Sequence, residues 1–304
     1  MKIIISGASG DLGQRVTTLL LQALPATDLI LLTRQPARLA ALAARGASVR
    51  QADFADPQSL PAAMHGGDVL LLISTLSIGR RTEQHGHAIA AARQAGVRHI
   101  VYTSSCGIQP QTPSISGQEH YASEQLLQAS GCDFTILRNS WYADVIPQLL
   151  LPAALAMGSI GFSTGAGRVA PVAKADCARA AAAVLRNVDR HRGAIYEITG
   201  PELFTVQELM ALCSTASGRP IVYQALSHEE KQAVFDAMGV ERDYREGMMN
   251  ATTNAWASRE MITYEMAIRQ GFFALCSRHV EMLTGEPATT FADLLEQYRA
   301  SWAD

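Results

Sequence analysis

The sequence lacks the features that mark several classes of protein. Its five cysteines are odd in number and form no C-x-x-C pair, which argues against a disulfide framework or a structural zinc site. It has no long apolar run, so we expect neither a signal peptide nor a membrane-spanning segment, and unpaired cysteines favour a cytoplasmic protein. Charge is sparse and nearly balanced, with a net value of −3. No basic surface is therefore expected for nucleic acid or an anionic membrane.

What the sequence does contain is a regular alternation of strand and helix patterns. Short, apolar, β-branched runs predict strands at residues 2–6, 28–33, 47–54, 68–74, 98–105 and 132–138. Patterns of helical period separate them at residues 12–24, 36–44, 57–64, 83–94 and 117–129. Strands that alternate with helices at this spacing predict parallel β-α-β units. The expected fold class is α/β, a Rossmann-type doubly wound parallel sheet.

After residue 139 the alternation becomes less regular. A helix is predicted at 174–187 and a strand at 194–200, and Thr205 with Glu208 fits a capping box for a further helix. From residue 227 onward the pattern is almost wholly helical. We therefore expect a Rossmann domain over residues 1–140. A smaller lobe over residues 141–304, partly interwoven with the first, should cover the carboxyl edge of the sheet.

Three glycines lie between the first predicted strand and the first predicted helix. In "SGASGDLG", Gly7, Gly10 and Gly13 follow a G-x-x-G-x-x-G spacing. Glycine allows a tight turn, lets backbone N–H groups approach a pyrophosphate, and lets the helix pack close to the strand. The helix N-terminus adds partial positive charge for an anion. An ordinary tight turn is the alternative, but the order strand, glycines and helix favours a dinucleotide-binding site.

The end of the second predicted strand bears on which dinucleotide is bound. An NAD site usually has an acid there for the ribose 2′-hydroxyl, whereas an NADP site offers arginine. This chain has Thr33-Arg34, and its nearest acid, Asp28, stands at the other end of the strand. Arg34 can bind a 2′-phosphate through charge-assisted hydrogen bonds, or it is simply a solvated loop residue. We expect NADP(H) as cofactor, with Arg38 as a further contact.

Other cofactor contacts follow from topology, because ligands of such sheets lie beyond the carboxyl ends of the strands. Asp53 and Phe54 follow the third strand, where the adenine is expected. Nearer the nicotinamide, the candidates that follow the fourth and fifth strands are Ser74, Thr75, Thr103 and Ser104. Serine and threonine are equally common as turn or cap residues at such positions.

The helix at residues 117–129 holds a tyrosine, Tyr121, with Gln125 four residues later. In short-chain dehydrogenases a lysine at that spacing lowers the pKa of the tyrosine, and glutamine has no charge with which to do so. His120 is a second candidate donor, either to a bound carbonyl or merely to backbone. His85 and His87 are two residues apart in a helix and share no face, so we expect no metal site.

These segments together resemble the NmrA-like branch of the atypical short-chain dehydrogenases over nearly the whole chain. The resemblance rests on "SGASGDLG", "HIVYTSS", "HYASEQLLQASGCDFTILRNSWYAD", "VAKADCARAAAAVL" and "YEITGPELFTVQEL". The third segment is similar to NADPH-dependent quinone oxidoreductases and triphenylmethane reductases, which place His120 and Glu124 in this helix instead of a Tyr-Lys pair. The resemblance assigns cofactor binding to Gly7, Ala8, Ser9, Gly10, Asp11, Leu12 and Arg34. It assigns the nicotinamide end to Asn139, Ser140, Trp141 and Tyr142.

The activity that the resemblance implies is hydride transfer from NADPH to a quinone, a dye or a small carbonyl compound. The helices at residues 227–271 are where such relatives differ most, so the resemblance does not name the acceptor. Two other functions stay open: a redox-sensing regulator that binds NADP without turnover, and isomerase chemistry on a nucleotide sugar. The missing Tyr-Lys pair weakens the isomerase hypothesis. A homodimer is compatible with the sequence.

Overall fold

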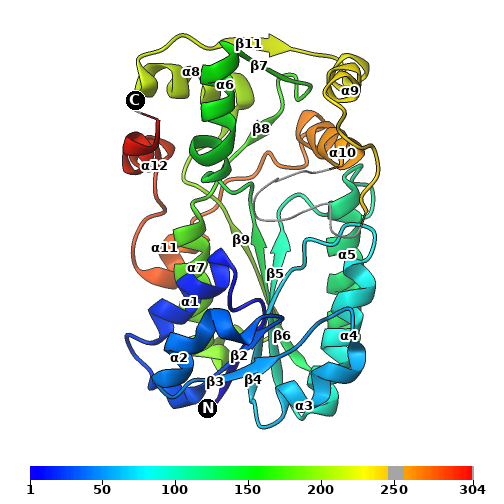
Figure 1. The fold of residues 1–304 in the computed structure, drawn as a ribbon, viewed down its shortest axis with the longest axis vertical. Coiled ribbons are helices and arrows are strands. Elements are labelled where there is room, and N and C mark those ends of the chain that lie inside the picture. The colour runs from blue at the N-terminus through cyan, green and yellow to red at the C-terminus, as the bar shows by residue number, and fades with distance from the viewer. Residues whose placement is uncertain (246–256, 303–304) are drawn as a thin grey trace.

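A seven-stranded parallel sheet forms the centre of the protein (Figure 1). The computed structural model describes residues 1–245 and 257–302. The strand order is β3-β2-β1-β4-β5-β6-β9, which is that of a doubly wound Rossmann sheet. The strands are β1 (Ile3–Ile5), β2 (Leu29–Thr33), β3 (Ser48–Gln51), β4 (Val69–Ile73), β5 (His99–Ser105), β6 (Asp133–Asn139) and β9 (Ala194–Ile198). The expected fold class is confirmed, as are the six strands predicted before residue 139, with ends that differ by a few residues.

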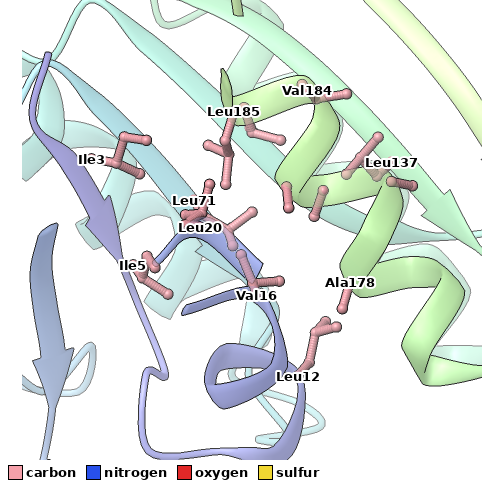
Figure 2. Close-up of a cluster of buried hydrophobic side chains, with 14 of the residues drawn as sticks. Ile3, Ile5, Leu12, Val16, Leu20, Leu71, Leu137, Ala178, Val184 and Leu185 are labelled. Atoms are coloured by element: carbon pink, nitrogen blue, oxygen red, sulfur yellow. The ribbon is translucent and has the colours of Figure 1, made fainter. Parts of the chain in front are cut away.

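The side chains of the strands alternate between two apolar layers, because successive residues of a strand point to opposite faces. On one face, α1 (Asp11–Leu20) and α7 (Lys174–Arg186) pack against β1, β4 and β6 (Figure 2). Ile3 and Ile5 belong to this layer, and Ile4 between them belongs to the other. Burial on both faces explains why these strands are apolar throughout.

On the opposite face lie α3 (Leu60–Met64), α4 (Arg81–Gln94) and α5 (Ile115–Gln128). Tyr102 of β5 is the bulkiest fully buried side chain of this layer. The short helix α2 (Ala40–Ala44) connects β2 to β3. Helix α5 packs on α4, and α10 (Ser258–Arg269), from the C-terminal part of the chain, also contacts α5. The face that carries Tyr102 is therefore the one on which the predicted donor helix lies.

The rest of the chain forms a lobe above the carboxyl ends of the strands (Figure 1). Its helices are α6 (Leu151–Met157), α8 (Val206–Ser217), α9 (His228–Ala237), α10 (Ser258–Arg269) and α12 (Phe291–Tyr298), while α11 (His279–Thr284) packs on α7. Two small sheets join them, made of the strands β7 (Ser159–Phe162), β8 (Arg168–Val169), β10 (Phe204–Thr205) and β11 (Val222–Ala225). The aromatic residues Trp141, Phe162, Tyr264, Phe272 and Phe273 pack in the core of this lobe, while Met248, Met249 and Trp256 lie outside the described residues.

Two elements from beyond residue 140 return to the sheet. Strand β9 pairs with β6, and α7 packs on α1. The capping box of α8 is confirmed: Thr205 accepts a hydrogen bond from Glu208 N–H, and the Glu208 carboxylate accepts one from Thr205 N–H. The boundary at residue 140 thus separates segments that share one sheet, and the division into two domains stays a prediction.

Candidate active site

The glycine turn joins β1 to α1 and is fastened to the neighbouring strand. Gly7 has φ +58°, a left-handed conformation that favours glycine. Its carbonyl accepts the N–H of Gly10 at 2.9 Å, and Ala8 N–H donates to Leu32 of β2 at 3.1 Å. Gly10 is the N-cap of α1 and offers no side chain to cap it. The N–H groups of the first helical turn, around Asp11 and Leu12, have no acceptors within the helix.

Gly13 allows the helix to pass close to this turn. A Cβ atom there would lie 2.4 Å from the Gly7 carbonyl oxygen and 2.8 Å from Ala8 Cα, both backbone atoms that cannot yield. Leu12 beside it is buried in the layer of α1 and α7. The turn therefore has the close packing and the open helix end that a pyrophosphate site requires.

Hydroxyl groups hold the turn against the end of β2. Ser9 Oγ and Thr33 Oγ1 are 2.8 Å apart, and Thr33 Oγ1 accepts the N–H of Gln35 at 3.1 Å. Arg34, which lies between Thr33 and Gln35 in the sequence, is exposed and has no acidic partner among residues 1–245 and 257–302. An unpaired guanidinium beside the turn is thus in the place where the sequence predicted a 2′-phosphate contact.

An ion-pair cluster adjoins the same turn. Asp11 accepts from Arg15 at 2.7 Å and from Lys174 Nζ at 3.0 Å. Burial alone would raise the pKa of Asp11, but hydrogen bonds from the two cations outweigh it and hold the pKa below its usual value. Lys174 Nζ also lies 5.8 Å from the ring centre of Tyr142. The structure therefore brings the glycine turn and the segment after β6 together.

Three enclosed polar atoms lie at or just beyond the carboxyl ends of β4, β5 and β6. Within the described part of the chain, no hydrogen-bond partner exists for Thr75 Oγ1, Ser104 Oγ or Asn139 Oδ1. Buried polar atoms of native proteins are nearly always satisfied, so such a group suggests a site for a polar ligand. All three residues were predicted to contact the cofactor, and the residues present therefore fit a dinucleotide.

Neighbouring residues have well-defined partners. Ser74 N–H donates to Thr103 Oγ1 at 3.0 Å, Ser140 N–H donates to the Ile198 carbonyl, and Asn139 Nδ2 donates to the Tyr142 hydroxyl at 3.2 Å. Burial raises the pKa of Tyr142, which keeps its phenol protonated. Trp141 packs against the core of the second lobe. These contacts fix the strand ends relative to one another.

The residues after β3 are occupied with local contacts. The Asp53 carboxylate accepts the N–H of Ala55 at 3.0 Å, which closes a turn of its own. Phe54 packs against the core layer of α3 and α4, and its carbonyl oxygen lies 3.0 Å from Nδ1 of His87. Both residues are half-buried. Their predicted contact with the adenine stays a prediction.

In α5, His120 faces the sheet. Its Nδ1 lies 2.7 Å from the Tyr102 hydroxyl, and both residues are buried. Burial, with the positive charge of Arg81 and the nearby His85, lowers the pKa of His120 well below its ordinary value. Tyr121 is half-buried, and Gln125 is exposed. The assignment of His120 and Tyr121 to catalysis stays a prediction. A neutral His120 can donate a hydrogen bond, but it carries no additional proton to transfer as a general acid.

Glu124, one turn after His120, is committed to an ion pair. Its two oxygens accept from Arg138 of β6, from Nε at 3.0 Å and from Nη2 at 2.7 Å, and Arg138 Nη1 also donates to Glu197 at 3.1 Å. Glu124 is 1% exposed. This fork-shaped pair joins α5 to the sheet and leaves the carboxylate no role as an acid or base.

From the sequence, no site role is expected for three side chains that adjoin these residues: Tyr102, His85 and Lys174. His85 accepts from Thr75 N–H through Nε2 at 3.1 Å, and its Nδ1 lies 2.9 Å from Ser123 Oγ. The pattern of "HIVYTSS" does place Tyr102 and Ser104 on one face of a strand. Nothing local indicates which helix covers that face, nor that Lys174 reaches Asp11. Among the described residues no cluster could hold a metal ion, and no helix is long and apolar enough to cross a membrane.

Known proteins are similar to this chain in sequence and in fold. The model of a family described as NAD(P)H-binding matches residues 7–188. Quinone oxidoreductase 2 of Escherichia coli is 35% identical over 291 residues, 96% of each chain, and NAD(P)H azoreductase of Xenophilus azovorans is 28% identical over 99% of each chain.

Two solved structures are similar over nearly their whole length. The NADPH-dependent quinone oxidoreductase of Escherichia coli, complexed with NADPH, has a TM-score of 0.86 at 34% identity and covers 97% of this chain and 99% of its own. The triphenylmethane reductase of Citrobacter sp., complexed with NADP(H), has a TM-score of 0.83 at 28% identity and covers 98% of this chain and 100% of its own. The chain therefore belongs to the NAD(P)H-binding family and is an NAD(P)H-dependent oxidoreductase of the NmrA-like, atypical short-chain dehydrogenase type.

Proposed function

We propose that this protein reduces quinones and comparably electrophilic small molecules with NADPH. The observation that carries the proposal is a buried, neutral histidine, His120, hydrogen-bonded to Tyr102 of β5 on a helix that lacks the lysine of a dehydrogenase's tyrosine-lysine pair. Relatives whose names specify quinones, azo compounds or triphenylmethane dyes support the same class of acceptor.

In this proposal the chain's own residues bind and orient the cofactor. The N–H groups at the start of α1 receive the pyrophosphate, and Arg34 pairs with the 2′-phosphate, which makes NADPH the preferred form. Lys174 offsets the negative charge of Asp11 next to the pyrophosphate. Thr75, Ser104 and Asn139 offer their unpartnered oxygens to the ribose and the carboxamide of the nicotinamide half.

The cofactor, when bound, supplies a hydride from nicotinamide C4. The hydride and its two electrons pass to the quinone, which forms an O–H bond at one carbonyl oxygen and leaves negative charge on the other. This hydroquinone monoanion then takes up one proton from water. His120 donates a neutral hydrogen bond to the oxygen on which negative charge develops. Because the aromatic ring delocalises that charge, a full proton transfer in the transition state is unnecessary. Simple ketones, which would form a localised alkoxide, should be poor acceptors.

The test is NADPH consumption by the purified chain with a panel of acceptors: substituted quinones, an azo dye, a triarylmethane dye and an aliphatic ketone. We expect oxidation with the first three classes and almost none with the ketone. Equal turnover of the ketone would contradict the proposed chemistry. Tight NADP(H) binding by calorimetry with no turnover of any acceptor would indicate a sensor instead.

A further inference from the structure

Tyr102 contacts the predicted donor His120 and has no role in the mechanism above. It stands in β5 with its side chain fully buried, and its hydroxyl lies 2.7 Å from His120 Nδ1. A hydroxyl buried in an apolar layer is costly unless it is hydrogen-bonded. The contact is therefore a defined interaction between the sheet and α5.

The relative donor and acceptor strengths of a phenol and an imidazole set the direction of this hydrogen bond. Burial raises the pKa of Tyr102 and lowers that of His120, so the phenol keeps its proton and the imidazole is neutral. A phenol O–H is a stronger donor than an imidazole N–H, and an imidazole nitrogen is a stronger acceptor than a phenol oxygen, so the O–H of Tyr102 donates and Nδ1 accepts. A neutral imidazole carries one N–H, and with Nδ1 acting as acceptor that proton is on Nε2.

A second buried histidine on the same face is held in the opposite tautomer. Thr75 N–H donates to His85 Nε2, so the single proton of His85 is on Nδ1 and points to Ser123 Oγ. Ser123 in turn donates its hydroxyl proton to the Glu119 carbonyl oxygen. The ring of His85 meets the ring of Tyr102 edge-on at 5.3 Å. Each histidine thus has a tautomer that a named neighbour selects.

The free side of His120 is its Nε2. Within residues 1–245 and 257–302 this nitrogen has no hydrogen-bond partner. It is also not one of the fully buried polar atoms that lack a partner, so it is accessible to a bound molecule. An N–H at this position can be donated to a bound molecule, whereas the other tautomer would present a lone pair and repel a carbonyl oxygen.

We propose that Tyr102 is a positioning residue that fixes His120 as the Nε2–H tautomer, so that the imidazole donates to the oxygen of the acceptor. The assignment of the acceptor's oxygen to His120 rests on the proposed function. The tautomer itself does not, and it can be measured without turnover.

The first experiment measures imidazole nitrogen chemical shifts by NMR at neutral pH, assigned with the variants His120→Gln and His85→Gln. In the wild type we expect a neutral Nε2–H pattern for His120 and a neutral Nδ1–H pattern for His85. In Tyr102→Phe, which keeps the ring but removes the hydroxyl, His120 should show a mixture while His85 is unchanged. An Nδ1–H pattern for His120 in the wild type, or an unaltered His120 in Tyr102→Phe, would overturn the proposal.

The second experiment is kinetic and uses a quinone acceptor. Glutamine places an N–H close to the Nε2 position, whereas the shorter asparagine reaches only the Nδ1 position. His120→Gln should therefore retain more activity than His120→Asn, with equal NADPH affinity. Tyr102→Phe should lower kcat by up to about tenfold, as expected for one neutral hydrogen bond. Combining Tyr102→Phe with His120→Ala should add no further loss, since Tyr102 acts only through His120.

The outcomes separate the two proposals. Additive losses in the double variant would mean that Tyr102 merely stabilises the fold, which would overturn its positioning role. A wild type with the expected tautomers but no turnover of any acceptor would leave the assignment of Tyr102 intact and refute the proposed function.

Discussion

Glu124 and Arg138 form a buried, two-point ion pair between α5 and β6, with Nη2 of the arginine 2.7 Å from Oε2 of the glutamate. Glu124 lies one turn after His120 and directly before Gln125, the residue at the lysine spacing from Tyr121. The two-point geometry of the ion pair makes it a structural contact that holds α5 on the sheet.

Glu124→Gln should destabilise the protein by about 3 kcal/mol, because it leaves the charge of Arg138 half-buried with only Glu197 as partner. Turnover per folded molecule should change little. The measurement is urea unfolding alongside quinone reductase activity. Glu296→Gln is the matched control, since Glu296 is 69% exposed in its pair with Arg299 and should matter by less than about 0.5 kcal/mol. A large drop in kcat without a loss of stability would assign Glu124 to the chemistry.

Arg34→Ala should remove the preference for NADPH. A charged hydrogen bond is worth about 1.5–3 kcal/mol, so the Kd for NADPH should rise about 10- to 100-fold while that for NADH stays the same. Calorimetric titration with both cofactors measures the ratio of the Kd for NADH to the Kd for NADPH. Arg45→Ala removes another exposed charge, directly after α2, and should leave the ratio of the two Kd values unchanged. A wild type that binds NADH as tightly as NADPH would show that Arg34 has no such role.

Lys174→Met should weaken NADPH binding by roughly fivefold, because Asp11 then faces the pyrophosphate with one cation fewer and a partly exposed pair is worth about 1 kcal/mol. The double variant Asp11→Asn with Lys174→Met should recover most of the affinity. If the double variant binds as weakly as Lys174→Met, then Lys174 contacts the cofactor directly and charge compensation is the wrong account.

Stability should fall as the pH drops below neutrality. Burial lowers the pKa of His85 to about 3 and that of His99 to about 4, from an ordinary value of 6.5. The unfolded chain therefore takes up protons between pH 6.5 and about 4 while the folded chain does not. Each such histidine lowers the free energy of unfolding by about 1.4 kcal/mol for every pH unit by which the pH falls in that window. Urea unfolding at several pH values in this window gives the free energy of unfolding as a function of pH. This free energy should depend less steeply on pH in His99→Gln than in the wild type, while His65→Gln, at an exposed site, should match the wild type. Identical slopes for His99→Gln and the wild type would contradict the linkage.

The fold could be predicted from the sequence because its signals are local. The run Ile3–Ile5 and the glycines after it specify a buried strand and an open helix end without reference to the rest of the chain. The place of β9 could not be predicted in this way, since its pairing of Thr135 with Ala194 depends on the competition among all strands for one sheet edge.

For the candidate site, the sequence indicates individual residues but not the contacts between them. Thr75 and Ser104 follow from the rule that ligands lie at the carboxyl ends of strands, Asn139 follows from the family resemblance, and each has an unpartnered oxygen. The contacts of Lys174 with Asp11 and of Tyr102 with His120 depend on the position and rotation with which the helices pack on the sheet. Periodicity gives the face of a residue but not its partner across a layer.

The most direct test of the account is steady-state reduction of a quinone by NADPH with Tyr121→Phe beside the wild type. If the reaction needs no tyrosine acid, kcat should fall by tenfold or less, the size expected for one neutral hydrogen bond. Gln125→Lys, which restores the spacing of a dehydrogenase pair at an exposed position, should not raise turnover. A thousandfold loss in Tyr121→Phe with unchanged NADPH affinity has the size of a lost general acid. That result would contradict the claim that hydride transfer here proceeds without one.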